Sequence, residues 1–76
     1  MEITEQNLHR INNDVNGNPR YVLHYILIDN CTYNEALSKC RQLGGKKFNN
    51  KQFGGGIVFQ CYNTGKLVND LNNLNK

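Results

Sequence analysis

The feature that most constrains the fold is a helix with signals at both of its ends. Thr32 stands three residues before Glu35, a spacing typical of a capping box, in which each side chain satisfies a backbone amide at the helix start. Gly44 supplies the left-handed residue that often ends a helix. We therefore expect a helix between Thr32 and Gly44, and its buried face would carry Tyr33, Ala36, Leu37, Cys40 and Leu43.

The segment before this helix predicts a strand. Residues 20–28 alternate, are rich in β-branched and aromatic side chains, and are nearly apolar on both faces, which is typical of a central strand covered on one side and partly on the other. The exposed face would carry either His24 or the tyrosines Tyr21 and Tyr25. Asn16-Gly17, a strong hairpin signal, predicts a partner strand over residues 8–15. A competing interpretation is a helix over residues 4–13.

The C-terminal half adds one or two strands and a second helix. We expect a strand over residues 57–62 and a short one over residues 46–49. Asn63 or Thr64 would cap a final helix with Leu67, Val68, Leu71 and Leu74 on one stripe. The predicted fold is a single α+β domain spanning residues 1–76. It has a small antiparallel sheet, built from an N-terminal hairpin and the C-terminal strand or strands, with two helices packed on one face.

Length limits the class of protein. The 76 residues exclude a two-domain enzyme, and the longest apolar run, residues 21–28, is too short to cross a bilayer. The N-terminus has no apolar segment behind a basic start, so we expect a complete cytoplasmic protein without a signal peptide. A chain of this size has a marginal core, which makes a homodimer one expectation.

Cysteine usage favours structural thiols. Cys31, Cys40 and Cys61 are odd in number and contain no C-x-x-C pair, so reduced thiols are expected, with Cys40 and Cys61 as small buried hydrophobic residues. Their spacing is not typical of zinc sites, and no metal or cofactor is predicted. His24 and Cys61 lack a recognisable carboxylate to orient a catalytic pair, so we expect no enzyme activity.

Charge is the most informative feature for function. Residues 1–35 carry five acids and two bases, a balance of −3, whereas the residues between Glu35 and Asp70 carry six bases and no acid. If the acidic hairpin packs beside Lys46 to Lys51, the two fields cancel within a Debye length. If they lie on opposite sides, the molecule is dipolar and would steer toward an acidic surface.

The basic segment supplies the candidate binding site. Cations interleaved with phenylalanines are typical of surfaces that combine phosphate contacts with base stacking. The candidate partner-binding residues are Lys39, Arg41, Lys46, Lys47, Phe48, Lys51 and Phe53. The alternative is a solvated helix face and a soluble loop. Gly54-Gly55-Gly56 predicts a bulge or a close backbone approach, or alternatively a mobile recognition loop.

Two stretches of the chain also resemble a known group of proteins. Residues 13–22, NDVNGNPRYV, and residues 54–63, GGGIVFQCYN, are similar to small accessory proteins encoded by bacteriophages and mobile elements. The resemblance implies an accessory gene acting in a bacterial cell, and it carries over no site residues. By analogy with small phage proteins that occlude host machines, we expect a non-catalytic, anti-CRISPR-like inhibitor of a host nucleic-acid-targeting or defence complex. Direct DNA or RNA binding is the alternative.

Overall fold

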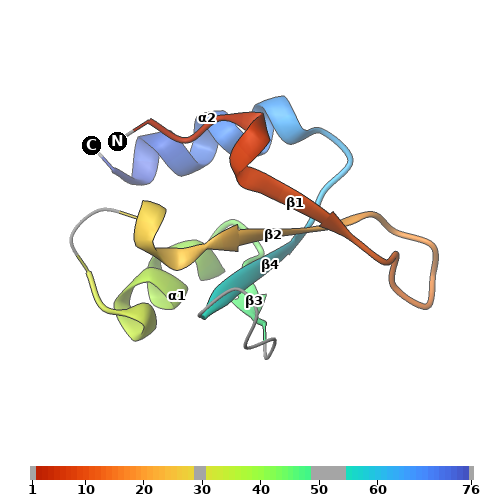
Figure 1. Ribbon diagram of the computed structural model, residues 1–76, viewed down its shortest axis with the longest axis horizontal. Coiled ribbons are helices and arrows are strands. Elements are labelled where there is room, and N and C mark those ends of the chain that lie inside the picture. Colours follow the sequence, from red (N-terminus) through yellow and green to blue (C-terminus); the bar gives the residue numbers. More distant parts are fainter. Residues whose placement is uncertain (1, 29–30, 49–54, 76) are drawn as a thin grey trace.

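The chain folds into one antiparallel sheet with two helices. A computed structural model describes residues 2–28, 31–48 and 55–75. In chain order the elements are η1 (Glu5–Asn7), β1 (Leu8–Ile11), β2 (Arg20–His24), η2 (Tyr25–Leu27), α1 (Tyr33–Arg41), β3 (Lys46–Lys47), β4 (Gly56–Gln60) and α2 (Thr64–Leu74). The strands lie in the order β1-β2-β4-β3, and every pair is antiparallel (Figure 1). The predicted α+β class is confirmed.

One face of the sheet forms the core. The register aligns Leu8, Leu23 and Ile57 across three strands, and Phe59 follows two residues later on the same face. These side chains form a single buried cluster with residues of both helices, namely Ala36, Leu37 and Cys40 of α1 and Leu67 and Leu71 of α2. Both helices therefore pack on this face, as predicted. We call it the inner face and the opposite one the outer face.

The N-terminal hairpin is confirmed, and the alternative helix over residues 4–13 is wrong. The first strand is shorter than predicted, because it ends at Ile11 and leaves a long loop before Arg20. Asp14 organises that loop: its Oδ1 accepts the backbone amides of Asn16 and Asn18 at 2.9 and 2.8 Å. Such local bonds compete with the ladder and end the pairing early. Gly17 adopts a φ of 82° at the turn, and in Figure 1 the loop projects away from both helices.

The second strand also ends earlier than predicted, at His24 instead of Ile28. The side chain of His24 caps the turn η2, because its Nδ1 accepts the backbone amide of Ile26 at 3.4 Å. The turn exposes Ile26 and returns Ile28 to the core, where it is fully buried. The apolar run therefore serves two structures, a strand and a turn. This break also means that Tyr21 and Tyr25 do not share one strand face.

The predicted helix signals are confirmed at both ends of α1. The Thr32 hydroxyl accepts the amide of Glu35, and the Glu35 carboxylate accepts the amide of Thr32, both at 3.3 Å. At the other end Gly44 has a φ of 83°. The amide of Gly44 donates to the carbonyl of Arg41, and the amide of Gly45 donates to the carbonyl of Cys40. This is a Schellman motif, and it turns the chain directly from α1 into β3.

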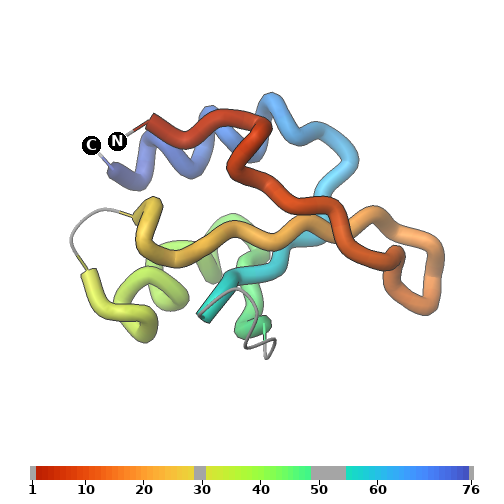
Figure 2. The backbone as a smooth tube through the Cα atoms, viewed as in Figure 1, coloured from red at the N-terminus to blue at the C-terminus, as the bar shows by residue number. Residues whose placement is uncertain are grey.

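The N-terminal segment lies along the C-terminal helix. Asn63 caps α2 by accepting the amide of Lys66 at 3.0 Å, as predicted. The side chain of Asn72 on α2 accepts the amide of Ile3 at 2.8 Å and donates to its carbonyl at 2.9 Å, so it holds the N-terminal segment along the helix (Figure 2). Within the described ranges, neither helix has the length and apolarity needed to span a bilayer.

Candidate functional site

Four of the predicted binding residues gather at one end of the molecule. Lys39 and Arg41 lie on the last turns of α1, and Lys46 and Lys47 form β3, which contacts that helix. All four side chains are exposed. We call these four residues the basic end. Phe48 follows β3 and is half-buried, whereas Lys51 and Phe53 lie outside the described residues.

The basic end is divided between two surfaces. Adjacent residues of a strand point to opposite faces. Lys47 is paired with Ile57 of the inner face, and Lys46 is paired with Val58 of the outer face. Lys39 and Arg41 belong to the helix layer. They are two positions apart, so their directions around the helix axis differ by roughly 200°. Lys46 alone of the four reaches the outer face of the sheet.

The outer face presents a different mixture of side chains from the inner face. One row across the strands contains His9, Val22, Val58 and Lys46, and its neighbours contain Arg20 beside Gln60 and His24 beside Gly56. Phe48 joins this face by alternation, and its amide bonds to the carbonyl of Gly56 at 3.2 Å. Val22 is fully buried and Val58 half-buried. Within the described residues, the core cluster to which both helices contribute does not include Val22.

A small cleft lies between the cations of the outer face. It has a volume of about 140 Å³. Its walls are Asp14, Arg20, Gly44, Lys46, Val58 and Gln60. Pockets for whole small molecules have volumes of roughly 300–1,000 Å³, so this cleft has the size for one charged group. We call it the Arg20–Lys46 cleft.

One carboxylate lies in the wall of this cleft. Asp14 accepts the amides of Asn16 and Asn18, the side-chain amide of Asn18 at 3.2 Å, and the side-chain amide of Gln60. The backbone hydrogen bond from Asn18 is the largest cause that lowers the pKa of Asp14, and the Arg20 charge adds to it. Asp14 is therefore ionised at neutral pH, and its oxygens are occupied by donors of its own chain.

The positions of the acidic and basic residues show how far their electrostatic fields are separated. β1 and β3 are opposite edges of the sheet, about 14 Å apart at the usual strand spacing. Glu5 lies on the β1 side and accepts the Thr64 hydroxyl of α2 at 2.5 Å, more than a Debye length of about 8 Å from the edge strand with the lysines. Among the described residues, Asp14 and Glu35 depart from this separation. The loop of Asp14 lies beside Lys46. Hydrogen bonds from Thr32 and the charge of Lys39 lower the pKa of Glu35.

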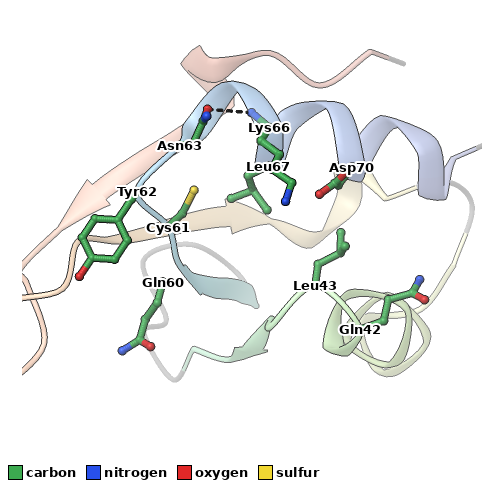
Figure 3. Close-up of a pocket in the computed structure, with 9 residues that line it drawn as sticks. All are labelled: Gln42, Leu43, Gln60, Cys61, Tyr62, Asn63, Lys66, Leu67 and Asp70. Atoms are coloured by element: carbon green, nitrogen blue, oxygen red, sulfur yellow. Dashed lines mark hydrogen bonds between the residues drawn. The ribbon is translucent and has the colours of Figure 1, made fainter.

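A larger groove opens at the far end of β4. It has a volume of about 450 Å³. It is lined by Gln42, Leu43, Gln60, Cys61, Tyr62, Asn63, Lys66, Leu67 and Asp70. Figure 3 shows Leu43 and Leu67 pointing toward each other across it, while the ring of Tyr62 points away. Lys66 and Asp70 carry opposite charges, so the groove has no net preference for an anion or a cation.

The cysteines divide into one buried thiol and two that are half-buried. Cys40 is fully buried, as predicted, and its burial raises the pKa of the thiol to about 11. The same prediction is wrong for Cys61, which is half-buried because β4 ends at Gln60 and leaves it beside the groove. The register pairs His24 with Gly56, five residues from Cys61 or roughly 16 Å along a strand. The two residues are not neighbours.

The glycine run and the missed residues have structural explanations. Gly55 has a φ of 98°, and a Cβ there would lie 3.1 Å from the ring of Tyr33, so the predicted close approach is confirmed at this position. Arg20 was not among the predicted binding residues. Its alternation with Val22 and His24 was visible in the sequence, but which strand face turns inward was not.

Comparison with known proteins identifies the family. The family model described as Staphylococcus phage terminal repeat-encoded protein TreK matches residues 1–76. No curated protein and no solved structure matches the chain. Since the match covers the whole sequence, the predicted phage origin is confirmed, and the chain belongs to the Staphylococcus phage terminal repeat-encoded protein TreK family.

Proposed function

We propose that this phage protein acts without catalysis, by binding an acidic component of a host nucleic-acid-targeting or defence complex and thereby inhibiting it. Membership of a phage family places the gene in an infecting genome, where such an inhibitor would act. The proposal is anti-CRISPR-like in its mechanism, because contact alone blocks the host machine. The acidic component is a protein surface or the nucleic acid that the complex handles.

The observation that carries the proposal is the basic end. Its four cations are exposed, and they stand on a helix and a strand that the Schellman turn joins without a flexible linker. Gly45 packs so closely that a Cβ there would lie 2.8 Å from the Cβ of Cys40 and 2.9 Å from the ring of Phe59. Cations held on such a rigid frame lose less entropy on binding than cations on a loop. Complementary charge also accelerates encounter with an acidic partner.

A plasmid-interference assay tests the proposal. A staphylococcal strain with an active restriction or nucleic-acid-guided defence system is transformed with a plasmid that this system targets, with and without expression of the chain. We expect expression to raise the transformation efficiency, and the double reversal Lys46→Glu with Lys47→Glu to abolish the effect while the thermal midpoint stays within a few degrees.

The chain offers a matched control for the reversal. Arg10 and Lys66 are exposed on β1 and α2, so Arg10→Glu with Lys66→Glu makes the same change in net charge elsewhere on the molecule. This control should keep the inhibitory effect. Retained activity in the Lys46 and Lys47 double variant, or no effect of the wild-type chain on any targeted plasmid, would contradict the proposal.

A further inference from the structure

We infer that the outer face of the sheet binds single-stranded nucleic acid and seats one backbone phosphate in the Arg20–Lys46 cleft. The inference rests on the proposed function and names its acidic component. It moves the principal contact from the helix layer, where Lys39 and Arg41 lie, to the sheet surface. Among the predicted binding residues, Lys46 and Phe48 remain in this site.

The two cations of the cleft are positioned to hold an anion. Arg20 donates from its Nε to the carbonyl of Asn12 at 2.8 Å, which fixes the guanidinium at the mouth of the cleft. In the part of the chain that the structure describes, its terminal nitrogens donate no hydrogen bond, so this fork can receive an anion. Lys46 approaches the same cleft from the edge strand. A planar fork beside a point charge is a common arrangement for phosphate recognition.

The carboxylate of Asp14 does not fill the cleft. Asp14 already accepts hydrogen bonds from Asn16, Asn18 and Gln60, so its oxygens face its own loop and strand β4. The two cations exceed this single charge, and the cleft keeps a net positive charge at neutral pH. An incoming phosphate would therefore meet donors that the fold has not fully neutralised.

Ring side chains lie on the same face of the sheet as the cleft. His24 and Phe48 lie on either side of Gly56 in the neighbouring row. The imidazole of His24 stacks on Tyr25 with a centroid separation of 5.6 Å, which supports it from behind. Arg20 and His24 are four residues apart on β2, roughly 13 Å. Cations at one end of a face and rings at the other suit the backbone and bases of a single strand.

Adjacent lysines on opposite faces allow a sharp test. Fluorescence anisotropy with the full chain would measure the Kd for a labelled thymidine oligonucleotide at 50 and 200 mM NaCl, with a duplex of equal length as the second probe. We expect the wild-type chain to bind the single strand more tightly than the duplex, and the affinity to fall as salt rises. Lys46→Gln and Arg20→Gln should each weaken binding about tenfold, because each removes a charged phosphate contact.

The control variants separate the effect of the Arg20–Lys46 cleft from the effect of net charge. Lys47→Gln and Lys39→Gln remove the same charge from the inner side and the helix layer, and each should weaken binding less than about threefold through the general field alone. Asp14→Asn should tighten binding, because it removes the one carboxylate among the described residues that line the cleft. Equal losses for Lys46→Gln and Lys47→Gln, equal or tighter binding of the duplex, or no binding at 50 mM salt would each overturn the inference.

Comparison of the oligonucleotide titration with the plasmid-interference assay distinguishes failure of the outer-face inference from failure of the proposed function. If the oligonucleotides do not bind but the chain still protects a targeted plasmid, the outer-face inference is wrong and the acidic component is a protein. If neither effect is seen, both proposals fail. Thermal midpoints within a few degrees of wild type for Lys46→Gln and Lys47→Gln would exclude unfolding as the cause of a difference between them.

Discussion

The two faces of the sheet use the same strands for different purposes. The inner face carries Leu23, Ile57 and Phe59, all essentially inaccessible to solvent, and both helices pack on it. The outer face carries cations, rings and amides around Val22. Because side chains alternate along a strand, a single residue step separates a position that holds the fold from one that meets solvent. Phe59, which is buried, and Gln60, which is exposed, show this division within two residues.

This difference indicates where sequence change is tolerated. An inner-face substitution removes packing from a core that a short chain cannot replace, since small domains bury a limited fraction of their surface. Substitution of an exposed outer-face residue such as Lys46 or Gln60 changes charge and shape with little effect on packing, whereas Val22 is fully buried on the same face. The outer face is therefore where this fold can acquire a binding function without losing stability. Four predictions test the division, from the largest expected effect to the smallest.

Phe59→Ala should have the largest effect on stability. The side chain is buried against α1 and the turn at Gly45, so its removal leaves a cavity that costs about 3–5 kcal/mol of unfolding free energy. Urea denaturation followed by circular dichroism would measure it. Gln60→Ala, the exposed neighbour on the other face, is the control and should change stability by less than about 1 kcal/mol. A similar loss for both variants would show that the two faces do not differ as described.

Gly45→Ala should destabilise the protein by about 1–3 kcal/mol, because the new methyl group clashes with Cys40 and Phe59. Gly65→Ala is the matched control within α2, where a Cβ meets nothing closer than 3.5 Å. The control should be neutral or gain up to about 1 kcal/mol, because alanine favours the helix. Thermal denaturation of both variants would check the pair, and a neutral Gly45→Ala would contradict the tight packing between α1 and the sheet.

Asn72→Ala should cost about 1–2 kcal/mol, because Asn72 makes two hydrogen bonds to the backbone of Ile3. Without them, the N-terminal segment loses its attachment to α2. The exposed neighbour Asn73→Ala should stay within about 0.5 kcal/mol of wild type. Hydrogen exchange at the amide of Ile3 would report the local loss, and unchanged protection would contradict the role of Asn72.

Asp14→Asn should produce the smallest effect, visible mainly in the pH dependence of stability. Hydrogen bonds in the folded state lower the pKa of Asp14 below its ordinary value of 3.8, so the ionised carboxylate stabilises the hairpin loop above that pH and the contribution is lost as pH falls below it. We expect the thermal midpoint of the variant to fall less between pH 5 and pH 2 than that of wild type. A parallel fall in both proteins would show that the loop does not depend on this charge.

The sequence predicts the parts of the fold that local chemistry specifies. Thr32, Glu35, Gly44 and Asn63 cap their helices as expected, because their bonds join residues only a few positions apart. The strand ends were harder to predict. The side chains of Asp14 and His24 bond to nearby backbone amides, and those bonds end β1 and β2 before the apolar pattern does. Hydrophobic alternation alone carries no information about such competition.

The candidate site was only partly predictable, because the sequence does not show which of two adjacent strand residues faces outward. The charge bias identified Lys46 and Lys47 together, but the pairing with β4 decides which of them faces outward. Arg20 is 40 residues from Gln60 in the sequence and lies beside it only through the register of β2 and β4. A linear pattern of charge cannot show that juxtaposition. It becomes visible once the inner face is known from the buried residues.

The central claim is that the outer face, and not the helix layer, receives the ligand. Amide chemical-shift mapping of the isotopically labelled chain during titration with a thymidine oligonucleotide tests it most directly. We predict that the largest shifts cluster on Arg20, His24, Lys46 and Gln60, with little change in α1 and α2. Shifts concentrated on Lys39, Arg41 and the residues of the groove at Leu67, with an unperturbed outer face, would contradict the claim.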